Sequence, residues 1–180
     1  MENQGPTKEM LKVEDAINII VSKATSLQEE TILLKNSLNR VNSKNIYANI
    51  NSPPENVSSM DGYALKYSSI KNIAKNPIKI VGESAAGNPY LKKLKNFECV
   101  EIYTGAEVPK GANLILLQER VIINNNFIVS TSQNYKKEQY IRKKGINFKN
   151  NSLIIKKNIL ITSRKLSLAI SSNHTKINVY

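Results

Sequence analysis

The first regular pattern of hydrophobic positions along the chain has the period of an α-helix. Apolar side chains recur at i, i+3, i+4, i+7 and i+8 through Val13, Ala16, Ile17, Ile20 and Val21. This spacing gathers them on one side of a helix, where an apolar stripe normally packs against the core. The pattern therefore predicts an amphipathic helix over residues 12 to 24 with one buried face.

Between this helix and the first prolines the apolar runs are short. Residues 32 to 34 (Ile-Leu-Leu) predict a short strand that leads into a second helix near residues 35 to 42. Residues 46 to 48 (Ile-Tyr-Ala) continue toward Pro53 and Pro54. The chain up to about residue 50 is therefore expected to be rich in helix.

From about residue 64 the pattern changes to short apolar runs separated by turn residues, which predicts a mostly β module. Strands are predicted at residues 77–81, 99–103, 114–117, 121–123 and 127–130. The last two are joined across three asparagines at 124–126, which predicts a hairpin.

Beyond residue 140 the pattern is mixed. Two short apolar runs, one or two helical turns and the start of a strand are predicted in turn at residues 152–155, 159–161, 165–170 and 177–180.

Composition adds a charge that the hydrophobic pattern does not show. The chain has 26 basic and 14 acidic residues among 180, a formal net charge of +12, and such an excess attracts nucleic acid or anionic membranes. The basic residues are mostly lysines spread over every segment, without an arginine cluster or interleaved aromatic residues for base stacking. We therefore expect no specific nucleic-acid partner and only weak, salt-sensitive binding to duplex DNA.

The single cysteine and the first residues bear on the compartment. Cys99 lies in a predicted strand and cannot form an internal disulfide, which fits a reducing cytoplasm. The first residues lack a signal-peptide pattern, and no run approaches the ~18 apolar residues of a membrane span. We expect a cytoplasmic chain without a membrane partner.

His174 has no second histidine beside it, which disfavours a zinc or other transition-metal site.

The segment from residue 51 to residue 64 carries the most specific candidate chemistry. Pro53 and Pro54 stiffen its entry, and it ends at Asp61 and Gly62. A carboxylate on a constrained loop beside small hydroxyl residues suits phosphate or metal chemistry, whereas Asp-Gly is also the commonest hairpin turn. Both interpretations of Asp61 are open from this segment alone.

Four further segments accompany it in a set order. They are residues 82–89 (Gly-Glu-Ser-Ala-Ala-Gly-Asn-Pro), 101–113 (Glu-Ile-Tyr-Thr-Gly-Ala-Glu-Val-Pro-Lys-Gly-Ala-Asn), 118–119 (Gln-Glu) and 141–145 (Ile-Arg-Lys-Lys-Gly). In this order and at these spacings the chain resembles the amino-terminal part of the MoeA family, the molybdopterin molybdenumtransferases, whose eukaryotic relatives include the E domain of gephyrin. The resemblance covers nearly the whole chain and stops where the family continues into a larger, nucleotide-binding-like domain.

The resemblance implies an α+β fold with two subdomains. Residues 1–50 and 141–180 would pack together as an elongated helix and strand subdomain I, and residues 51–140 would form an inserted, mostly β subdomain II. Because the family's pterin-binding domain has no counterpart here, the chain is expected to be a fragment, or one part of a split enzyme that a second chain completes. Family members are homodimers with the cleft between subdomain II of one subunit and the pterin-binding domain of the other. At most half of an active site is therefore expected in this chain.

The resemblance also implies a role in molybdenum cofactor biosynthesis. The family inserts molybdate into adenylylated molybdopterin and releases AMP in a Mg²⁺-dependent step. Asp61 and Thr104 match the catalytic positions: Asp61 would position a metal-bound water or the substrate, and Thr104, with the backbone N–H groups of Gly105 and Ala106, would present donors. The other implied substrate-binding residues are Ser59, Met60, Gly62, Arg142 and Asn147. From the residues alone, Thr104 could equally satisfy its own turn.

Two positions depart from the family pattern. The family usually reads Gly-Glu-Asp-Ile where residues 145–148 read Gly-Ile-Asn-Phe, and Gly-Ala-Asp where residues 111–113 read Gly-Ala-Asn. Asparagine keeps the shape and carbonyl acceptor of aspartate but lacks the charge that a magnesium ion needs. The competing hypothesis is therefore a non-catalytic interaction or scaffold module of the same fold, with a basic binding protein as a more distant one.

Overall fold

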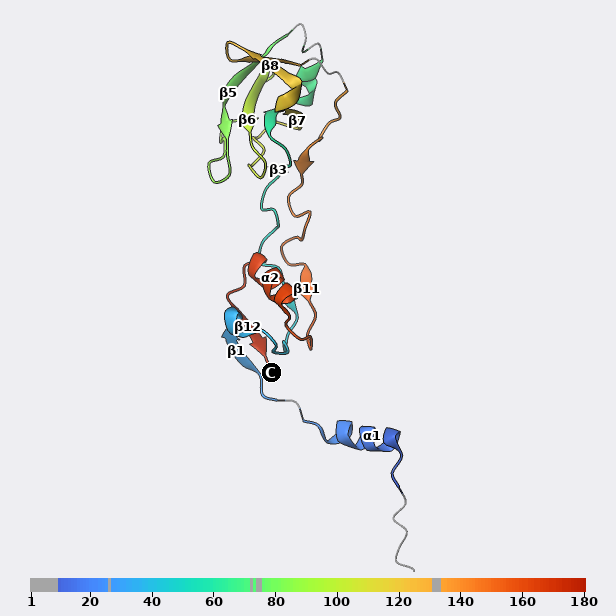
Figure 1. Cartoon of the computed structure of the whole chain (residues 1–180). Helices are drawn as coiled ribbons and strands as arrows, with labels where there is room; N and C mark the ends of the chain where they lie inside the picture. The colour runs from blue at the N-terminus through green and yellow to red at the C-terminus, as the bar shows by residue number, and fades with distance from the viewer. Residues whose placement is uncertain (1–9, 26, 72, 74–75, 131–133) are drawn as a thin grey trace, which may run out of the picture.

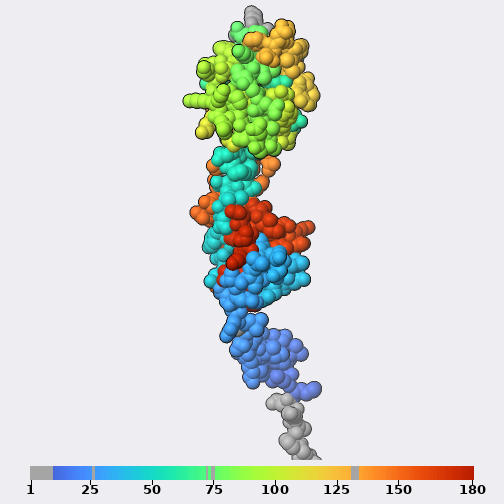
Figure 2. Space-filling model, turned by 90° about the vertical axis from the view of Figure 1, so that its left-hand side faces the viewer, coloured from blue at the N-terminus to red at the C-terminus, as the bar shows by residue number. Residues whose placement is uncertain are grey.

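The computed structural model describes residues 10–25, 27–71, 73, 76–130 and 134–180. These residues form two packed bodies joined by a narrow waist, and the N-terminal helix lies outside both (Figure 1). The space-filling view has the same elongated outline, with the waist between the green body and the red and blue body (Figure 2).

The body that holds the C-terminus is built from segments at the two ends of the sequence. Strand β1 (Glu30–Leu33) pairs antiparallel with β12 (Lys176–Val179), and β2 (Ile46–Tyr47) pairs antiparallel with β11 (Leu153–Ile155). Helix α2 (Ser163–Ser171) packs beside them. Their buried core side chains are Leu34, Ile46, Ile155, Ile161, Ala169, Ile177 and Val179. The alternation in β12 explains its pairing, because Ile177 and Val179 are buried while Lys176 and Asn178 are not.

The other body is a six-stranded sheet with the order β7-β4-β6-β5-β9-β8. Its strands are β4 (Gly62–Leu65), β5 (Ile78–Ser84), β6 (Glu98–Ile102), β7 (Leu114–Leu117), β8 (Val121–Asn124) and β9 (Phe127–Ser130). Strands β5 and β6 are parallel, and the other neighbours are antiparallel. The central strands are buried on both faces: Leu65 and Cys99 belong to one apolar cluster, and Ala64 and Ile102 belong to another.

The waist consists of two segments far apart in the sequence. Strand β3 (Val57–Ser58) pairs antiparallel with β10 (Ile141–Arg142), and Ser52 forms an isolated bridge with Phe148. Three further short elements are 3₁₀-helices: η1 (Leu34–Asn36), η2 (Tyr67–Ile70) and η3 (Gln118–Arg120). The subdomain boundaries at residues 50 and 140 stay predictions.

Most of the predicted strands are confirmed. The runs at 77–81, 99–103, 114–117, 121–123 and 127–130 correspond to β5, β6, β7, β8 and β9, and the late elements correspond to β11, α2 and β12. The asparagine hairpin is also confirmed. Asn125 and Asn126 have φ values of 45° and 64°, as a tight two-residue turn between strands requires. The run at 159–161 makes only an isolated bridge between Val41 and Leu160.

The second predicted helix, near residues 35 to 42, is wrong. The chain makes only the single 3₁₀ turn η1 there, after which Asn39 has a φ of 63°. Asn42 then bridges to Val179, and its side chain is buried and bonded to the carbonyls of Lys44 and Lys156. Pairing with a distant segment therefore outweighs the local preference for helix.

The first predicted helix is present as α1 (Val13–Lys23), but its buried face is wrong. None of its residues is buried, and Val13, Ile17, Ile20 and Val21 are all exposed. The apolar period is real, but α1 lies away from both packed bodies (Figure 1). Periodicity predicts which face of a helix is apolar and does not say where the covering surface lies.

Strand β4 was missed by the sequence pattern, although every one of its residues is buried. Its sequence, Gly-Tyr-Ala-Leu, follows Asp61 and begins with the glycine of an expected turn. A Cβ atom on Gly62 would lie 1.8 Å from the carbonyl oxygen of Leu116. Gly62 is therefore required by the close approach of β7 rather than by a turn.

Candidate functional site

Asp61 and Thr104 meet at the end of the sheet. Gly62 in β4 pairs with Ile102 in β6, so the residue before β4 lies beside the turn that follows β6. The carboxylate atom Oδ1 of Asp61 accepts the backbone N–H of Thr104 at 2.7 Å and the Thr104 hydroxyl at 2.8 Å. Both residues are exposed. Two segments 43 residues apart thus form one polar pair at the surface.

These two bonds explain the ionisation of Asp61. The backbone N–H of Thr104 and then its hydroxyl lower the pKa of Asp61 below the ordinary 3.8, because both donors favour the charged form. No hydrogen bond to Oδ2 is found among the described residues. Asp61 therefore carries a fixed negative charge, and its second oxygen, Oδ2, accepts from neither of the two Thr104 donors.

The residues next to Asp61 are tied to the waist. Ser59 donates from its backbone N–H and its hydroxyl to the carbonyl of Tyr140, at 2.9 and 3.0 Å. The Ser58 hydroxyl donates to the carbonyl of Met60, whose side chain is partly exposed. The hydroxyl of Ser59 is thus engaged by the fold, and Met60 presents an apolar surface beside Asp61.

The expectation that Gly105 and Ala106 offer free backbone N–H donors is wrong. The N–H of Gly105 donates to the carbonyl of Ser58 at 2.8 Å, and that of Ala106 donates to the carbonyl of Tyr103 at 2.9 Å. Ala106 is also fully buried. Gly105 has a φ of 85°, so it serves the turn through its backbone freedom. In this turn, the backbone N–H and the hydroxyl of Thr104 both donate to Asp61.

Arg142 and Asn147 form a second polar pair. Nη2 of Arg142 donates to Oδ1 of Asn147 at 3.2 Å, and the Asn147 amide donates to the Ser52 hydroxyl at 3.1 Å. Both side chains are exposed. A neutral amide does not balance the guanidinium charge, so Arg142 keeps its positive charge uncompensated by this partner.

A cleft of about 520 Å³ lies beside these groups. Gly105 and Arg142 line it together with Glu55, Glu107, the two prolines of the waist and the 85–89 loop. Asp61, Thr104, Ser59, Met60 and Asn147 are not among its lining residues. The expected site residues therefore divide into the Asp61–Thr104 pair at the sheet end and the guanidinium of Arg142, with Gly105, in the neighbouring cleft.

Asn113, the other departure from the family pattern, has a structural role. Its Oδ1 accepts the N–H of Tyr67 at 2.6 Å, and its backbone N–H donates to Leu65. The side chain thus holds the entry to η2, a bond that an amide or a carboxylate oxygen could accept.

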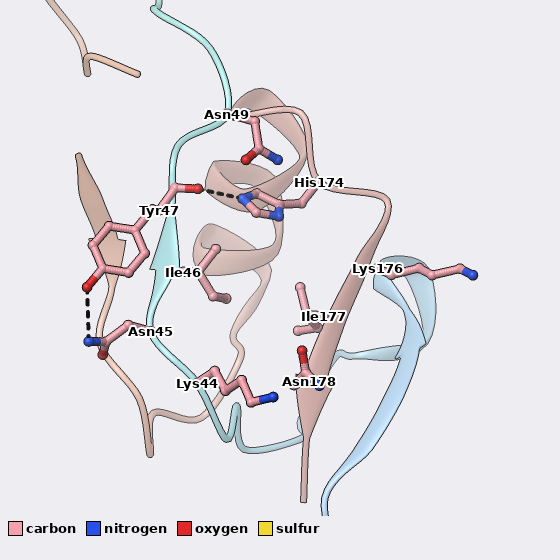
Figure 3. A pocket seen from close by; sticks show the side chains of 9 residues that line it. All are labelled: Lys44, Asn45, Ile46, Tyr47, Asn49, His174, Lys176, Ile177 and Asn178. Carbon is pink, nitrogen blue, oxygen red and sulfur yellow. Dashed lines mark hydrogen bonds between the residues drawn. The ribbon is translucent and has the colours of Figure 1, made fainter. Parts of the chain in front are cut away.

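His174 lies in a separate hollow of about 230 Å³ between β2 and β12 (Figure 3). Its Nε2 lies 2.7 Å from the carbonyl oxygen of Tyr47. Ile46 and Ile177 are also in this hollow, while the Lys176 side chain extends away from it (Figure 3). Lys44, at the same hollow, is paired with Glu29 at 2.7 Å.

A metal site is not assembled from these side chains. In the described ranges no group of three histidine, cysteine, aspartate or glutamate side chains is placed to hold a metal ion. Asp61 is thus a single candidate ligand. Likewise, no helix within the described residues is long and apolar enough to cross a membrane.

Sequence reasoning missed two residues beside Asp61. Glu101 raises the pKa of Tyr103, with smaller contributions from burial, Glu83 and Asp61. Glu101 and Tyr103 flank the buried Ile102, so strand alternation places both on the opposite face from it. That alternation was the signal in the sequence that could have grouped them.

The comparisons with known proteins decide the family. A family model described as the MoeA N-terminal region (domain I and II) matches residues 11–172. The chain belongs to the MoeA family. A molybdopterin molybdenumtransferase from Haemophilus influenzae is 29% identical over 153 residues, covering 85% of this chain and 37% of that protein. One from Staphylococcus aureus is 26% identical over 173 residues, covering 94% and 41%.

The MoeA fold is also seen in a solved structure. The crystal structure of the molybdopterin biosynthesis MoeA protein of Pyrococcus horikoshii superposes with a TM-score of 0.84 at 26% identity, covering 96% of this chain and 44% of that one. The predicted α+β fold class is therefore confirmed. The chain spans about two fifths of the length of the MoeA proteins that it matches.

Proposed function

We propose that this chain forms the N-terminal part of an enzyme that inserts molybdate into adenylylated molybdopterin and releases AMP. The observation that carries the proposal is the pairing of Asp61 with Thr104, two separate segments that converge on one exposed, charged carboxylate. Homologues named molybdopterin molybdenumtransferase support a role in molybdenum cofactor biosynthesis.

The proposed roles follow from charge and hydrogen bonding. Thr104 holds Asp61 in its ionised form and fixes its orientation, so that Oδ2 can accept a proton or bind a hydrated group of the substrate. Arg142 lines the neighbouring cleft with a guanidinium that a neutral amide leaves uncompensated. Molybdate and the phosphates of the second substrate are anions, which suits such a group.

Magnesium fits this chain only in part. Mg²⁺ takes six oxygen ligands, usually one or two carboxylates with waters and substrate phosphates. Among the residues that the structure describes, Asp61 is the one expected ligand with a free carboxylate oxygen, and Asn147 supplies no charge. We therefore propose that Asp61 contributes one ligand and that the others come from substrate and from groups outside this chain.

We also propose a cytoplasmic homodimer in which groups from outside residues 1–180 complete the site. They would belong either to a further part of the protein or to a second chain. The proposal predicts that the 180-residue chain alone does not convert adenylylated molybdopterin and molybdate.

The test joins residues 1–180 to the remaining part of the Haemophilus influenzae relative. AMP release and molybdenum incorporation are measured with magnesium present. Asp61→Asn should lower turnover by a factor on the order of 100 while the free energy of unfolding changes by less than about 0.5 kcal/mol, because the exposed amide oxygen can still accept from Thr104. Asp15→Asn, the same chemical change on exposed α1, is the matched control and should keep full turnover.

Full turnover by a folded Asp61→Asn protein would refute the catalytic role. An inactive chimera that still binds both substrates favours the non-catalytic scaffold module instead. AMP release by the 180-residue chain alone would contradict the need for outside groups.

A further inference from the structure

The two edge strands of the large sheet differ in how they are covered. Strand β7 is the edge nearer the sequence centre of the sheet body, and three of its four residues are buried. The segment before β10 lies along its open side, where the N–H of Ile115 donates to the carbonyl of Gln139 at 3.3 Å. Strand β8 is the other edge, and within the described residues it pairs with β9 alone. It lies at the end of this body far from the waist (Figure 1).

The open side of β8 offers backbone hydrogen-bonding groups. The hairpin loop consists of Asn125 and Asn126, and a two-residue loop is flanked by a hydrogen-bonded pair, here Asn124 and Phe127. Because bonded and non-bonded pairs alternate along an antiparallel ladder, the N–H and C=O of Ile123 point away from β9. Neither group has a partner within the described residues. A further strand alongside β8 would pair with both.

Two neighbouring isoleucines on β8 are more than half exposed. Ile122 and Ile123 are consecutive, so strand alternation places them on opposite faces of the sheet. Their side chains are nevertheless 57% and 56% exposed. An occupant that lies against one face of the sheet would cover only one of them. An occupant seated along the edge reaches both, as an added β-strand does.

A hollow of about 470 Å³ opens beside this edge, on the face opposite the buried Ile128. Ile122 lies opposite Val129 across the ladder, and Asn124 lies opposite Phe127. The residues that line the hollow are Pro77, Ile122, Asn124, Asn125, Phe127 and Val129. None of them is charged and most are apolar. The hollow therefore suits a bulky apolar side chain that projects from an added strand.

The charges around the hollow favour an acidic partner over a second copy. Residues 121–135 are the longest run without a charged residue in this chain of net charge +12. At its border lie Arg120, directly before β8, and Lys79, in the strand next to β9. Both are exposed, and neither forms an ion pair with the neighbouring Glu119 or Glu98. Acidic residues of a partner would complement these cations, whereas a second copy would bring another +12.

The size of this edge favours a short segment over a folded surface. Strand β8 has four residues, a length of about 14 Å at ~3.4 Å per residue. A stable interface between two folded proteins buries about 800 Å² on each partner, which is more than one short edge and one hollow offer. In β-strand addition, main-chain hydrogen bonds give affinity and pockets for alternate side chains give specificity, so a short extended segment suffices.

We propose that β8 and its hollow bind an extended segment of another polypeptide by β-strand addition. The segment places a bulky apolar side chain in the hollow and acidic residues two positions before and after it, where strand alternation directs them to the same face. The added strand pairs with the open backbone groups of Ile123 and covers the exposed Ile122 and Ile123 side chains. This inference does not depend on the proposed reaction.

The test is an NMR titration of the ¹⁵N-labelled 180-residue chain with the probe peptide acetyl-Asp-Val-Phe-Val-Asp-amide. Its phenylalanine and both aspartates lie on one side of an extended backbone. The amide signals of residues 122–124 should shift in a saturable manner. Exchange of the Ile123 amide with solvent should slow at least tenfold at saturating peptide. Absence of a saturable shift, or an unchanged exchange rate in the complex, would overturn the proposal.

Matched peptides separate strand addition from simple apolar contact. Lysine in place of both aspartates should weaken binding at least tenfold, and so should alanine in place of phenylalanine. Because successive N–H groups point to opposite edges of a strand, N-methylation of the phenylalanine and N-methylation of the following valine should differ at least tenfold in their effect. Equal affinity of the lysine or alanine peptide, or equal effects of the two N-methylations, would contradict the proposal.

Variants of the chain locate the site. Ile122→Ser removes a wall of the hollow, and Ile123→Pro removes the open N–H while sparing the ladder with β9; each should weaken peptide binding at least tenfold. Ile170→Ser, at an isoleucine of α2 that is 59% exposed, is the matched control and should bind like the parent. Parent-like binding by Ile122→Ser, or equal loss in the control, would overturn the assignment. Self-association that Ile122→Ser abolishes in sedimentation would show that the occupant is a second copy instead.

Discussion

Thr104 donates both its backbone N–H and its hydroxyl to a single oxygen of Asp61, at 2.7 and 2.8 Å. One donor belongs to the backbone and survives any substitution at 104, whereas the other belongs to the side chain. The two effects on Asp61 can therefore be separated by a single variant.

Thr104→Val should raise the pKa of Asp61 only part of the way toward 3.8, because the backbone donor, the larger cause, remains. A carboxylate with a lowered folded pKa stabilises the fold above its unfolded pKa, and this stabilisation is lost as the pH falls through the folded pKa. Thr104→Val should therefore lose less stability on acidification than the parent. An NMR titration of the Asp61 carboxyl and melting between about pH 2 and 5 measure both; an unchanged pKa would contradict the bond.

Gly62→Ala should destabilise the sheet by about 2 to 3 kcal/mol or prevent folding. The new Cβ would lie 1.8 Å from a backbone oxygen of Leu116, which cannot move without shifting β7. Gly87→Ala is the matched control: it has open space but a φ of 79°, so we expect a loss of about 1 kcal/mol from backbone strain. Urea unfolding of both variants gives the comparison, and equal losses would contradict close packing at Gly62.

Cys99 should be inert to thiol reagents in the folded protein. Burial, and then the charge of Glu101, raise its pKa to about 12, so almost no thiolate forms at neutral pH. Modification by a disulfide reagent should require unfolding. Ser22→Cys on exposed α1, in a Cys99→Ala background, is the control and should react at once. Rapid modification of Cys99 in the folded chain would mean that β6 opens readily.

Ile20→Gln on α1 should change the free energy of unfolding of the isolated chain by less than about 0.5 kcal/mol. Ile20 is 68% exposed, and glutamine is compatible with a helix. Ile102→Ala in β6 is the contrasting variant and should cost about 3 kcal/mol, because Ile102 is fully buried. A loss above about 1 kcal/mol for Ile20→Gln would show that α1 packs on something in solution.

Asn147→Asp should weaken molybdate binding about fivefold, the effect of roughly 1 kcal/mol from pairing a charge at the surface. The new carboxylate would lie where Oδ1 now accepts from Arg142 at 3.2 Å, and it would compensate the guanidinium. Asn113→Asp is the control. It makes the same change at a side chain whose Oδ1 accepts the Tyr67 N–H instead of the Arg142 guanidinium. Calorimetric titration with molybdate compares the two. Equal weakening in both variants would contradict the role of Arg142.

The sequence by itself determined the features that depend on neighbouring residues. The period of 3.6 in residues 13–23 specifies a helix, and the paired asparagines at 125 and 126 specify a tight hairpin, because both rest on local backbone preferences. The ordered motifs also identified the family, since five short segments at set spacings are hard to match by chance.

Only the tertiary structure decided which segments meet. Asn42 is drawn into a bridge with Val179 instead of a helix, and β4 becomes a central strand because β6 and β7 lie on its two sides. Asp61 gains its two donors from a turn 43 residues away, and Glu101 gains its neighbours from two other strands. The sequence predicted the apolar face of α1 but not that this face is exposed. Burial and long-range pairing depend on the whole chain, and no local pattern encodes them.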